Sequence, residues 1–254
     1  HDRKCLSCVR SGNCELQSLA VKFNIQNIEF EGEKAKHTID DLSPSIVRDF
    51  NKCILCRRCV GACKNVQHIG AIDCIERGFN SCISTAGDCS LNDVDCTFCG
   101  QCIEACPTGA LHEKDDTAKV WNYLHDKDLI KIVQTAPAVR VALGEEFGLP
   151  IGTNVKGKMV TALKRLGFDK VFDTNTGADF TIMEEANEFI DRFVSGENLP
   201  MMTSCCPAWV RFAEKNYPFQ LNHISSCKSP HQMFGAIIKS YYAEKNHIDP
   251  DKIF

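Results

Sequence analysis

Two cysteine-rich stretches, residues 53–63 and 96–107, decide how this chain folds. The first reads Cys53-Ile-Leu-Cys56-Arg-Arg-Cys59-Val-Gly-Ala-Cys63, and the second reads Cys96-Thr-Phe-Cys99-Gly-Gln-Cys102-Ile-Glu-Ala-Cys106-Pro107. Both have the spacing C-x2-C-x2-C-x3-C, and the second carries a trailing proline. Three thiols two residues apart lie on a tight loop that can surround one metal cluster. The fourth falls on the helix that follows, which points to a neighbouring cluster.

This spacing is the signature of bacterial ferredoxins that hold two [4Fe-4S] clusters, and in them the fourth cysteine of each run binds the other cluster. We therefore predict crossed ligation. A zinc ribbon uses two CxxC pairs rather than runs of four cysteines, and a disulfide scaffold fits this spacing no better. The predicted ligands of the first cluster are Cys53, Cys56, Cys59 and Cys106, and those of the second are Cys96, Cys99, Cys102 and Cys63.

A third group of metal-binding residues opens the chain as His1-x3-Cys5-x2-Cys8-x5-Cys14. One imidazole and three thiolates suit a third [4Fe-4S] cluster, and the neutral histidine should raise its reduction potential. A Cys3His zinc knuckle is the alternative, because both metals accept these ligands. The two cysteine runs that follow favour iron–sulfur.

Length and composition limit the class of protein. The 254 residues are enough for two domains, and the net charge of −4 indicates no nucleic-acid partner. No apolar run reaches the length of a membrane span. The 17 cysteines gather in metal-type clusters, which predicts a reducing, cytoplasmic location. Because the chain starts at His1 and ends at Phe254 in what looks like the beginning of a strand, we expect a piece of a longer protein.

After residue 112 the pattern changes to alternating strands and helices with short connections, which predicts helices covering a mostly parallel sheet. The predicted fold class is an α+β domain of the two-[4Fe-4S] ferredoxin type followed by an α/β lobe. The predicted domains are residues 1–25, 26–112 and 113–254. Sites in such lobes form at the carboxyl ends of strands, and the expected loops there are residues 135–137, 173–177 and 203–207.

The last of these loops, Thr203-Ser204-Cys205-Cys206-Pro207, follows a predicted strand and opens a predicted helix. Adjacent cysteines point in different directions, so one can bind a metal while the other faces a cavity. The N-terminus of a helix favours the thiolate form of a cysteine. Two buried thiols without a function are the plainer alternative.

The chain resembles the iron-only, or [FeFe], hydrogenases over essentially its whole length. Besides the cysteine motifs, the resemblance rests on Thr135-Ala136-Pro137, Gly177-Ala178-Asp179 to Glu188, Thr203 to Pro207, and Ser225-Ser226-Cys227-Lys228-Ser229-Pro230. It implies reversible conversion of H2 to protons and electrons in a hydrogenase lobe. The cofactor implied is an H-cluster, which is a [4Fe-4S] cubane bridged through a cysteine to a two-iron azadithiolate unit.

The resemblance also implies roles for individual residues. Cys206 becomes a cubane ligand and Cys205 the proton-carrying thiol, while Ala136, Pro137 and Ala138 correspond to the loop packed around the two-iron unit. The proton path maps onto Cys205, Glu188, Ser225 and Glu185, with Arg192 as its anchor. Glu185 and Glu188 share one helical face, and burial should raise their pKa enough to carry a proton. A solvated helix face is the alternative for these two carboxylates.

Some family features are missing or altered. The Met-Pro-Cys and Cys-x3-Cys motifs that supply the other cubane ligands are absent, so this sequence offers Cys206 alone to that cubane. It should still hold three accessory [4Fe-4S] clusters. Cys227 and His231-Gln232 resemble members that work with pyridine-nucleotide partners. We therefore expect a hetero-oligomer with ferredoxin or with NAD(P)-linked flavoprotein and iron–sulfur subunits.

Two other functions are compatible with parts of this pattern. One is an electron-transfer subunit like the large iron–sulfur subunit of respiratory complex I, which shares the N-terminal motif and a ferredoxin-like region. Such subunits lack the motifs at residues 203–207 and 225–230. The other is a sensor built on a hydrogenase scaffold. Sensors commonly alter the proton path, whereas this chain retains Cys205, Glu185, Glu188 and Ser225.

Overall fold

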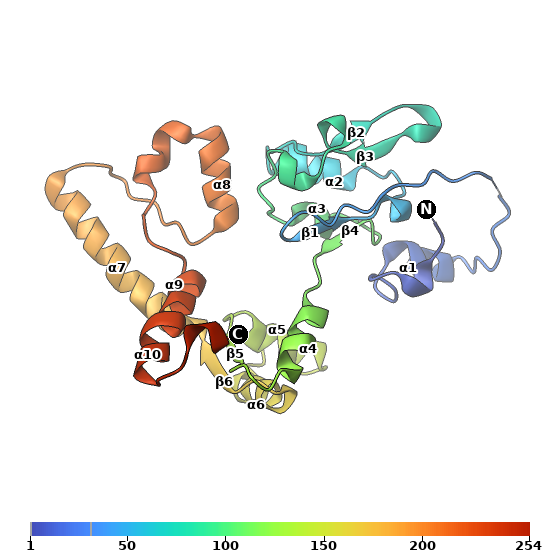
Figure 1. Ribbon diagram of the computed structural model, residues 1–254. Coiled ribbons are helices and arrows are strands. Elements are labelled where there is room, and N and C mark those ends of the chain that lie inside the picture. The colour runs from blue at the N-terminus through green and yellow to red at the C-terminus, as the bar shows by residue number, and fades with distance from the viewer. Residues whose placement is uncertain (1, 31) are drawn as a thin grey trace. The chain divides into compact units, whose positions relative to one another are not determined.

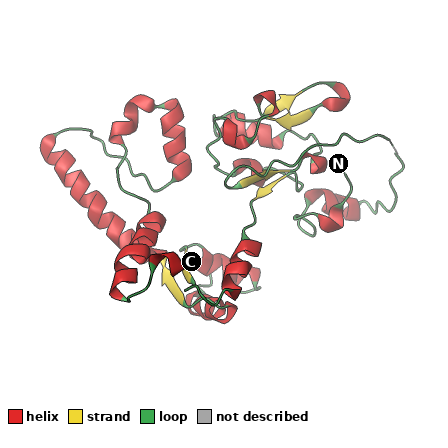
Figure 2. Cartoon of the chain, viewed as in Figure 1, coloured by secondary structure: helices red, strands yellow, loops and turns green. Residues whose placement is uncertain are grey.

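The computed structural model describes residues 2–30 and 32–254. Its chain divides into two compact units, one ending at Asp115 and the other spanning Asp116–Phe254 (Figures 1 and 2). We refer to them as unit 1 and unit 2. Within the described ranges, no helix combines the length and the apolar character that crossing a membrane requires.

Unit 1 is built from two short antiparallel strand pairs and the cysteine loops between them. Strand β1 (Ile46–Arg48) pairs with β4 (Leu111–Glu113), and β2 (Asp73–Ile75) pairs with β3 (Cys82–Ser84). Each cysteine run therefore leaves one strand pair and enters the other. The helices of unit 1 are short: α1 (Glu15–Lys22), α2 (Arg58–Gly61) and α3 (Gln101–Glu104).

The core of unit 1 contains cysteines as well as aliphatic and aromatic side chains. Ile46, Ile83 and Leu111 come from the strands and are almost completely buried. Cys59 and Cys96, one from each run, belong to the same buried cluster. Burying apolar area stabilises the unit by about 25 cal/mol per Å². The strands thus form an apolar floor that packs against the cysteine loops.

A buried ion pair fastens the preceding segment to this floor. The Arg48 guanidinium is almost fully buried and donates to the Asp40 carboxylate at 2.8 Å, to Ser84 Oγ and to the Cys89 carbonyl. Burial alone would raise the pKa of Asp40. The hydrogen bonds from Ser90, the Leu91 N–H and Arg48 outweigh it, so the pKa of Asp40 lies below its usual range. A buried charge with its partners satisfied in this way holds the chain in one arrangement.

Unit 2 contains the longer helices. Strands β5 (Ile132–Thr135) and β6 (Lys170–Asp173) pair in parallel, and isolated parallel bridges join Ile130 to Ile253 and Met202 to Ile224. A more extensive parallel sheet stays a prediction. A π-helical turn (Ile238–Tyr242) connects the last two helices. The helices are α4 (Thr117–His125), α5 (Val139–Glu146), α6 (Lys156–Leu166), α7 (Thr174–Ser195), α8 (Pro207–Asn216), α9 (Pro230–Ile237) and α10 (Ala243–Lys245).

One expected loop of unit 2 is helical instead. Residues 174–177 form the first turn of α7, because the Asp173 side chain accepts a hydrogen bond from the Asn175 N–H and caps the helix. Asp173 also pairs with Arg140 at 2.6 Å and with Lys156 at 2.9 Å. The prediction of a loop over residues 173–177 was therefore wrong. The carboxyl end of β6 therefore continues directly into the first turn of α7.

Helices α7 and α9 cross at very close range. A β-carbon added at Gly177 would overlap the Pro230 carbonyl oxygen and lie 2.9 Å from the β-carbon of Phe234. Glycine is therefore the residue that lets the two helices touch. Thr181, one turn later, donates to the Gly177 carbonyl and contacts the sulfur of Met233. This crossing fixes α7, which carries the two predicted proton-path carboxylates.

We expect Gly177→Ala to lower the free energy of unfolding of unit 2 by about 1–3 kcal/mol, the usual cost of overpacking. The obstructing atom belongs to the backbone of α9, so the helix itself would have to shift. Tryptophan fluorescence during urea unfolding measures this, because Trp121 and Trp209 both lie in unit 2. Gly157→Ala in α6, where the added carbon meets open space, is the control and should leave stability unchanged or higher. Equal stability of the two variants would contradict the close crossing.

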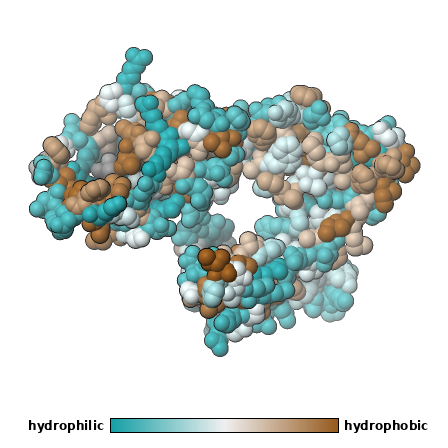
Figure 3. Space-filling model, turned by 180° about the vertical axis from the view of Figure 1, so that it is seen from behind, coloured by the Kyte–Doolittle hydropathy of each residue, from teal (hydrophilic) through white to brown (hydrophobic). Residues whose placement is uncertain are grey.

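Hydrophobic residues also reach the surface of the protein (Figure 3). Helix α7 contributes many of them, and they accompany the polar residues along its length. The exposed apolar residues of α7 are Phe180, Ile182, Met183, Phe189, Ile190, Phe193 and Val194.

Candidate functional site

The two cysteine loops of unit 1 share one backbone conformation. Leu55 and Phe98, each placed just before the second cysteine of its run, have positive φ angles of 57° and 55°. Their N–H groups donate to the first sulfur of the run, Leu55 to Cys53 at 3.3 Å and Phe98 to Cys96 at 3.4 Å. Non-glycine residues are strained in this conformation, and such strain is typical of binding sites. Amide hydrogen bonds to sulfur stabilise negative charge on a thiolate.

The residues that follow the second cysteine of each run also match in backbone conformation. Arg57 has a φ of 60° and Gly100 a φ of 80°, and they stand at the N-terminal ends of α2 and α3. The chain therefore reverses direction after the second cysteine and presents the third one from the first helical turn. The two cysteine loops therefore have equal length and matching backbone conformations.

The first predicted ligand set gathers around one small cavity. Cys53, Cys56, Cys59 and Cys106 all line it, under an apolar cover that includes Ile83 and Leu111. Burial, followed by the negative charge of Cys106 and Cys53, raises the pKa of Cys59 to about 12. Cys106 comes from the second run, so this grouping is the one that crossed ligation predicts. Four thiols with so few polar neighbours fit a group that neutralises their charge, such as iron.

The second set shows the matching arrangement. Burial raises the pKa of Cys102 to about 12, and the charges of Cys96, Cys59, Cys99 and Cys63 contribute to the shift, so cysteines of both runs lie near it. Cys63 stands on a π-helical turn (Ala62–Val66) that continues α2, and such turns are frequent at functional sites. In the described part of the chain, no His, Cys, Asp or Glu residues are grouped closely enough to hold a single metal ion. The four thiolates of a cubane each bind a different iron atom.

The N-terminal cysteines lie against the second cysteine run. The Glu15 N–H donates to the Pro107 carbonyl at 3.1 Å, and Cys14 Sγ lies 3.5 Å from the same oxygen. A β-carbon at Gly109 would lie 2.5 Å from Cys8 Sγ, so the glycine makes room for that sulfur. Within unit 1, the cysteines of the third predicted ligand set therefore lie close to Cys106.

Ion pairs also attach the N-terminal segment to residues in and beside the first cysteine run. Arg58, which neighbours Cys59, forms two hydrogen bonds with the Glu15 carboxylate at 2.6 and 3.1 Å. Lys52 is buried and pairs with Asp2 at 2.9 Å. Cys5 begins a short 3-10 turn beside them (Cys5–Ser7). The fourth predicted ligand of this set, His1, lies outside the described residues.

In unit 2 the first of the two adjacent cysteines, Cys205, faces an open cavity of about 740 Å³. Cys205 lines it together with Ser204, Thr174 and the start of α9. Both α8 and α9 begin at this cavity, each with a proline in its first turn, so their positive ends favour an anionic group there. Cys205 and Cys206 are exposed. The plainer expectation of two buried thiols is therefore wrong.

A cluster of polar side chains joins α7 to the loop before α9. Ser225 is buried, and its hydroxyl donates to Glu188 Oε2 at 2.7 Å. Arg192 donates to Glu188 Oε1 at 2.7 Å, and the Ser226 N–H donates to both oxygens. Arg192 also donates to the carbonyl of Ile224 at 3.0 Å. The structure thus brings Glu188, Ser225 and Arg192 into direct contact.

These contacts reverse the expected shift at Glu188. Burial alone would raise the pKa of the carboxyl. The hydrogen bonds from Ser225, Ser226 and Arg192 outweigh burial, so the pKa of Glu188 lies below its usual range. The prediction that Glu188 has a raised pKa was wrong, because every one of these partners donates to the charged form. Glu188 is a carboxylate at neutral pH.

Glu185 differs from its neighbour one turn along the helix. Its Oε1 atom is buried and has no hydrogen-bond partner among the described residues. Buried polar atoms without a partner are rare in folded proteins. A donor from a group bound beside it would satisfy this oxygen.

Main-chain pairing attaches the cysteine loop to this polar cluster. The Ser225 N–H donates to the Met202 carbonyl at 2.7 Å, and Met202 forms the isolated bridge with Ile224. Two residues further along each segment, the Ser204 hydroxyl donates to the Cys227 carbonyl at 2.6 Å. Cys205 is thus positioned relative to Ser225 and Glu188 through Ser204.

The predicted loop at Ala136, Pro137 and Ala138 follows β5, and all three residues are exposed. Gln134, at the end of the strand, donates to the His231 carbonyl at 3.1 Å and accepts from Thr174 at 3.2 Å. Thr174 and His231 both line the cavity that contains Cys205. Gln134 was missed in the sequence because a single amide in a short strand gives no signal of its role.

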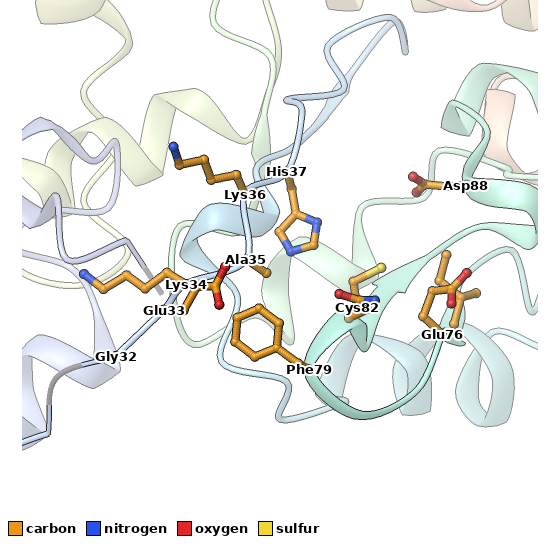
Figure 4. A pocket seen from close by; sticks show the side chains of 12 residues that line it. Gly32, Glu33, Lys34, Ala35, Lys36, His37, Glu76, Phe79, Cys82 and Asp88 are labelled. Carbon is orange, nitrogen blue, oxygen red and sulfur yellow. The ribbon is translucent and has the colours of Figure 1, made fainter.

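A further cavity, of about 870 Å³, lies in unit 1 and is separate from these sites (Figure 4). It lies between residues 32–37 and the hairpin of β2 and β3, and His37, Phe79 and Asp88 are among the side chains around it. Its cysteine, Cys82, belongs to neither run. We therefore place the candidate chemistry at the cysteine loops and at the Cys205 cavity.

Comparison with known families agrees with this arrangement. Residues 130–254 match the iron only hydrogenase large subunit, C-terminal domain. Residues 43–112 match the ferredoxin-like domain of NADH-quinone oxidoreductase subunit 3, and residues 1–29 match the NADH-ubiquinone oxidoreductase-G iron-sulfur binding region. The chain belongs to the iron-only hydrogenase large subunit family, with a ferredoxin-like iron–sulfur domain before the hydrogenase domain. The resemblance found in the sequence is confirmed.

Individual relatives show how much of the family is represented. The chain is 49% identical to the NADP-reducing hydrogenase subunit HndD of Solidesulfovibrio fructosivorans and 42% identical to iron hydrogenase 1 of Clostridium pasteurianum. Each match covers 100% of this chain and 44% of the relative, so the chain spans less than half the length of these proteins. Cytosolic iron-sulfur assembly component 3 of Pongo abelii is 32% identical over 65% of this chain and 36% of its own length.

A solved structure supports the fold of the second half. The apo [FeFe]-hydrogenase HydA1 from Chlamydomonas reinhardtii, in a variant form, is 43% identical and superimposes with a TM-score of 0.53. The match covers 55% of this chain and 36% of that chain.

Proposed function

We propose that the chain is part of a hydrogenase that converts H2 reversibly into two protons and two electrons. The observation that carries this proposal is the joined pair of motifs in unit 2. The Cys205–Cys206 loop opens onto a cavity, and Ser204 ties it to the Ser225, Glu188 and Arg192 cluster. A purely electron-conducting protein has no need of a thiol, a hydroxyl and two carboxylates arranged between a cavity and a helix surface.

The residues present fit the family's H-cluster in part. Cys206 precedes α8, where the positive helix end favours a thiolate ligand. The cavity beside it is large enough for a bound group, and Glu185 offers a buried carboxyl oxygen without a partner nearby on α7. When bound, the H-cluster supplies the metal chemistry of hydrogen. Its remaining protein ligands would come from segments outside this sequence.

The residues of this chain would move the proton. Cys205 would hold it at a thiol, which is a far stronger acid than a hydroxyl. Glu185 exchanges it at a buried carboxyl, and Ser225 and Glu188 pass it along a hydrogen bond of 2.7 Å. Arg192 keeps Glu188 charged and oriented. General acid–base groups of this kind contribute about 10²–10⁴-fold to a rate.

Electrons would leave through the cysteine loops of unit 1. The proposed sequence runs from the cubane at Cys206 to the two clusters of the ferredoxin-like domain, then to the cluster of His1, Cys5, Cys8 and Cys14. We retain residues 1–25, 26–112 and 113–254 as the domains of this path. The name of the HndD relative, an NADP-reducing hydrogenase subunit, supports an NAD(P)-linked partner in a hetero-oligomer. The metal-type cysteine clusters support a cytoplasmic location.

The test is hydrogen turnover by a protein of the relatives' length that contains this chain and all its clusters. We expect H2 evolution with a reduced one-electron dye and H2 uptake with the oxidised dye. Cys89→Ala, at an exposed thiol outside the ligand sets, is the control and should retain both activities. Full cluster content without either activity would contradict the proposal and would leave an electron-transfer or assembly role.

A further inference from the structure

Cys227 lies at the centre of the polar cluster in unit 2. Its Sγ atom lies 3.8 Å from Glu188 Oε2, within hydrogen-bonding distance for sulfur. Its N–H donates to Ser225 Oγ at 3.1 Å, and its carbonyl accepts from Ser204 Oγ at 2.6 Å. One residue therefore contacts the cysteine loop, the serine and the carboxylate. In the sequence, Cys227 stood out only as a residue shared with members that work with pyridine-nucleotide partners.

The surroundings keep this thiol protonated. Cys227 is half-buried, and burial raises the pKa of its thiol. A hydrogen bond with Ser225 acts in the opposite direction, but the charges of Glu188 and Glu185 add to the increase. A thiol with a raised pKa carries its hydrogen at neutral pH. Since Glu188 is ionised there and accepts only, the S–H group must be the donor between them.

We propose that Cys227 is a positioning residue of the proton path, in which its S–H group donates to Glu188 and holds that carboxylate charged and facing Ser225. This inference concerns the same site as the proposed hydrogenase function, and the effect of Cys227 on turnover depends on that function. The contact itself is independent of any bound cluster. The charged and titratable groups placed at Glu188 are Arg192 and Glu185 from α7 and Cys227 from the loop before α9.

Substitutions at Cys227 test the role of its side chain separately from the role of its main chain. Cys227→Ala retains the N–H and carbonyl contacts to Ser225 and Ser204, because both belong to the main chain. It removes only the donor to Glu188. Removing a donor to the ionised form raises the pKa of a carboxyl. Cys227→Ser restores a donor of shorter reach and should restore part of the effect.

Infrared spectroscopy of the chain with its clusters bound tests the contact directly. The difference between the wild-type chain and Cys227→Ala isolates one S–H stretching band. Cys89→Ala gives the reference band of an exposed thiol that donates over the same 3.8 Å to a neutral acceptor, the Gly87 carbonyl. We expect the Cys227 band at lower frequency than the Cys89 band. The carboxyl band that Glu188→Gln removes should titrate about 0.5 pH unit higher in Cys227→Ala, with Cys227→Ser between the two. Circular dichroism verifies that each variant is folded.

The same variants in the longer, active protein connect the contact to turnover. Protonation of Glu188 at higher pH should move the acidic limb of the pH–rate profile upward in Cys227→Ala, with partial return in Cys227→Ser. An S–H band at the Cys89 frequency together with an unshifted Glu188 titration would overturn the inference and leave the hydrogenase proposal intact. A lowered Cys227 S–H band in a protein without any hydrogen turnover would support the contact between Cys227 and Glu188 and contradict the proposed function.

Discussion

Serine in place of Cys205 should remove nearly all hydrogen turnover and leave the iron content unchanged. A hydroxyl is a far weaker acid than a thiol, so it is a much poorer group for holding and releasing a proton. Loss of such a group costs about 10²–10⁴-fold in rate. The residue lines the cavity at the start of α8, and its main chain is held by the Ser204 hydrogen bond, which the substitution retains. Hydrogen evolution and iron analysis on the same preparation measure both parts.

The neighbouring cysteine provides the matched comparison. Cys206→Ser changes the same atom one residue later, at the N-terminal end of α8, and should lose iron as well as activity. Cys89→Ser, at an exposed thiol of unit 1, should change neither. If Cys205→Ser lost iron while Cys206→Ser kept it, the two roles would be interchanged.

Removal of Cys63 should damage the cluster held by the other cysteine run. The charges of Cys59 on α2 and of Cys63 on the π-helical turn after it both reach Cys102. Cys106, in turn, lines the cavity of Cys53, Cys56 and Cys59. We therefore expect Cys63→Ala to eliminate or convert the cluster of Cys96, Cys99 and Cys102, and Cys106→Ala to affect the first cluster.

Electron paramagnetic resonance of the reduced chain distinguishes the two variants, supported by iron counts. Each should lose the signal of one cluster and retain the other. Cys74→Ala is the control, since this half-buried cysteine lies outside both runs and should retain every signal. Damage to the first cluster in Cys63→Ala would show that each run binds its own cluster.

The cysteine loops could be predicted from the sequence because spacing alone determines how thiols surround a cluster. Two helix ends in unit 2 can also be read from single residues, since Gly167 closes α6 in the left-handed conformation and Pro207 begins α8. The matching positive φ angles of Leu55 and Phe98 could not be predicted, because neither residue favours that conformation by itself. The cluster-binding loop imposes it.

The candidate site in unit 2 was predicted in its residues but not in its electrostatics. A carboxylate on a helix face can have a raised or lowered pKa, and the outcome depends on donors from distant segments. Ser225, 37 residues from Glu188, decides it here together with Ser226 and Arg192. The first turn of α7 was missed because the cap at Asp173 looks like an ordinary turn residue in sequence.

The carbonyl of Pro107 has a consequence for how charge would leave the protein. It belongs to the residue after Cys106 and accepts from the residue after Cys14, so a single hydrogen bond separates two predicted ligand sets. Electron tunnelling favours such short bonded bridges over gaps through space. The cluster of Cys53, Cys56, Cys59 and Cys106 would then be the one that exchanges electrons with the N-terminal cluster. Loss of the Cys53 cluster would separate the N-terminal cluster from the other electron carriers.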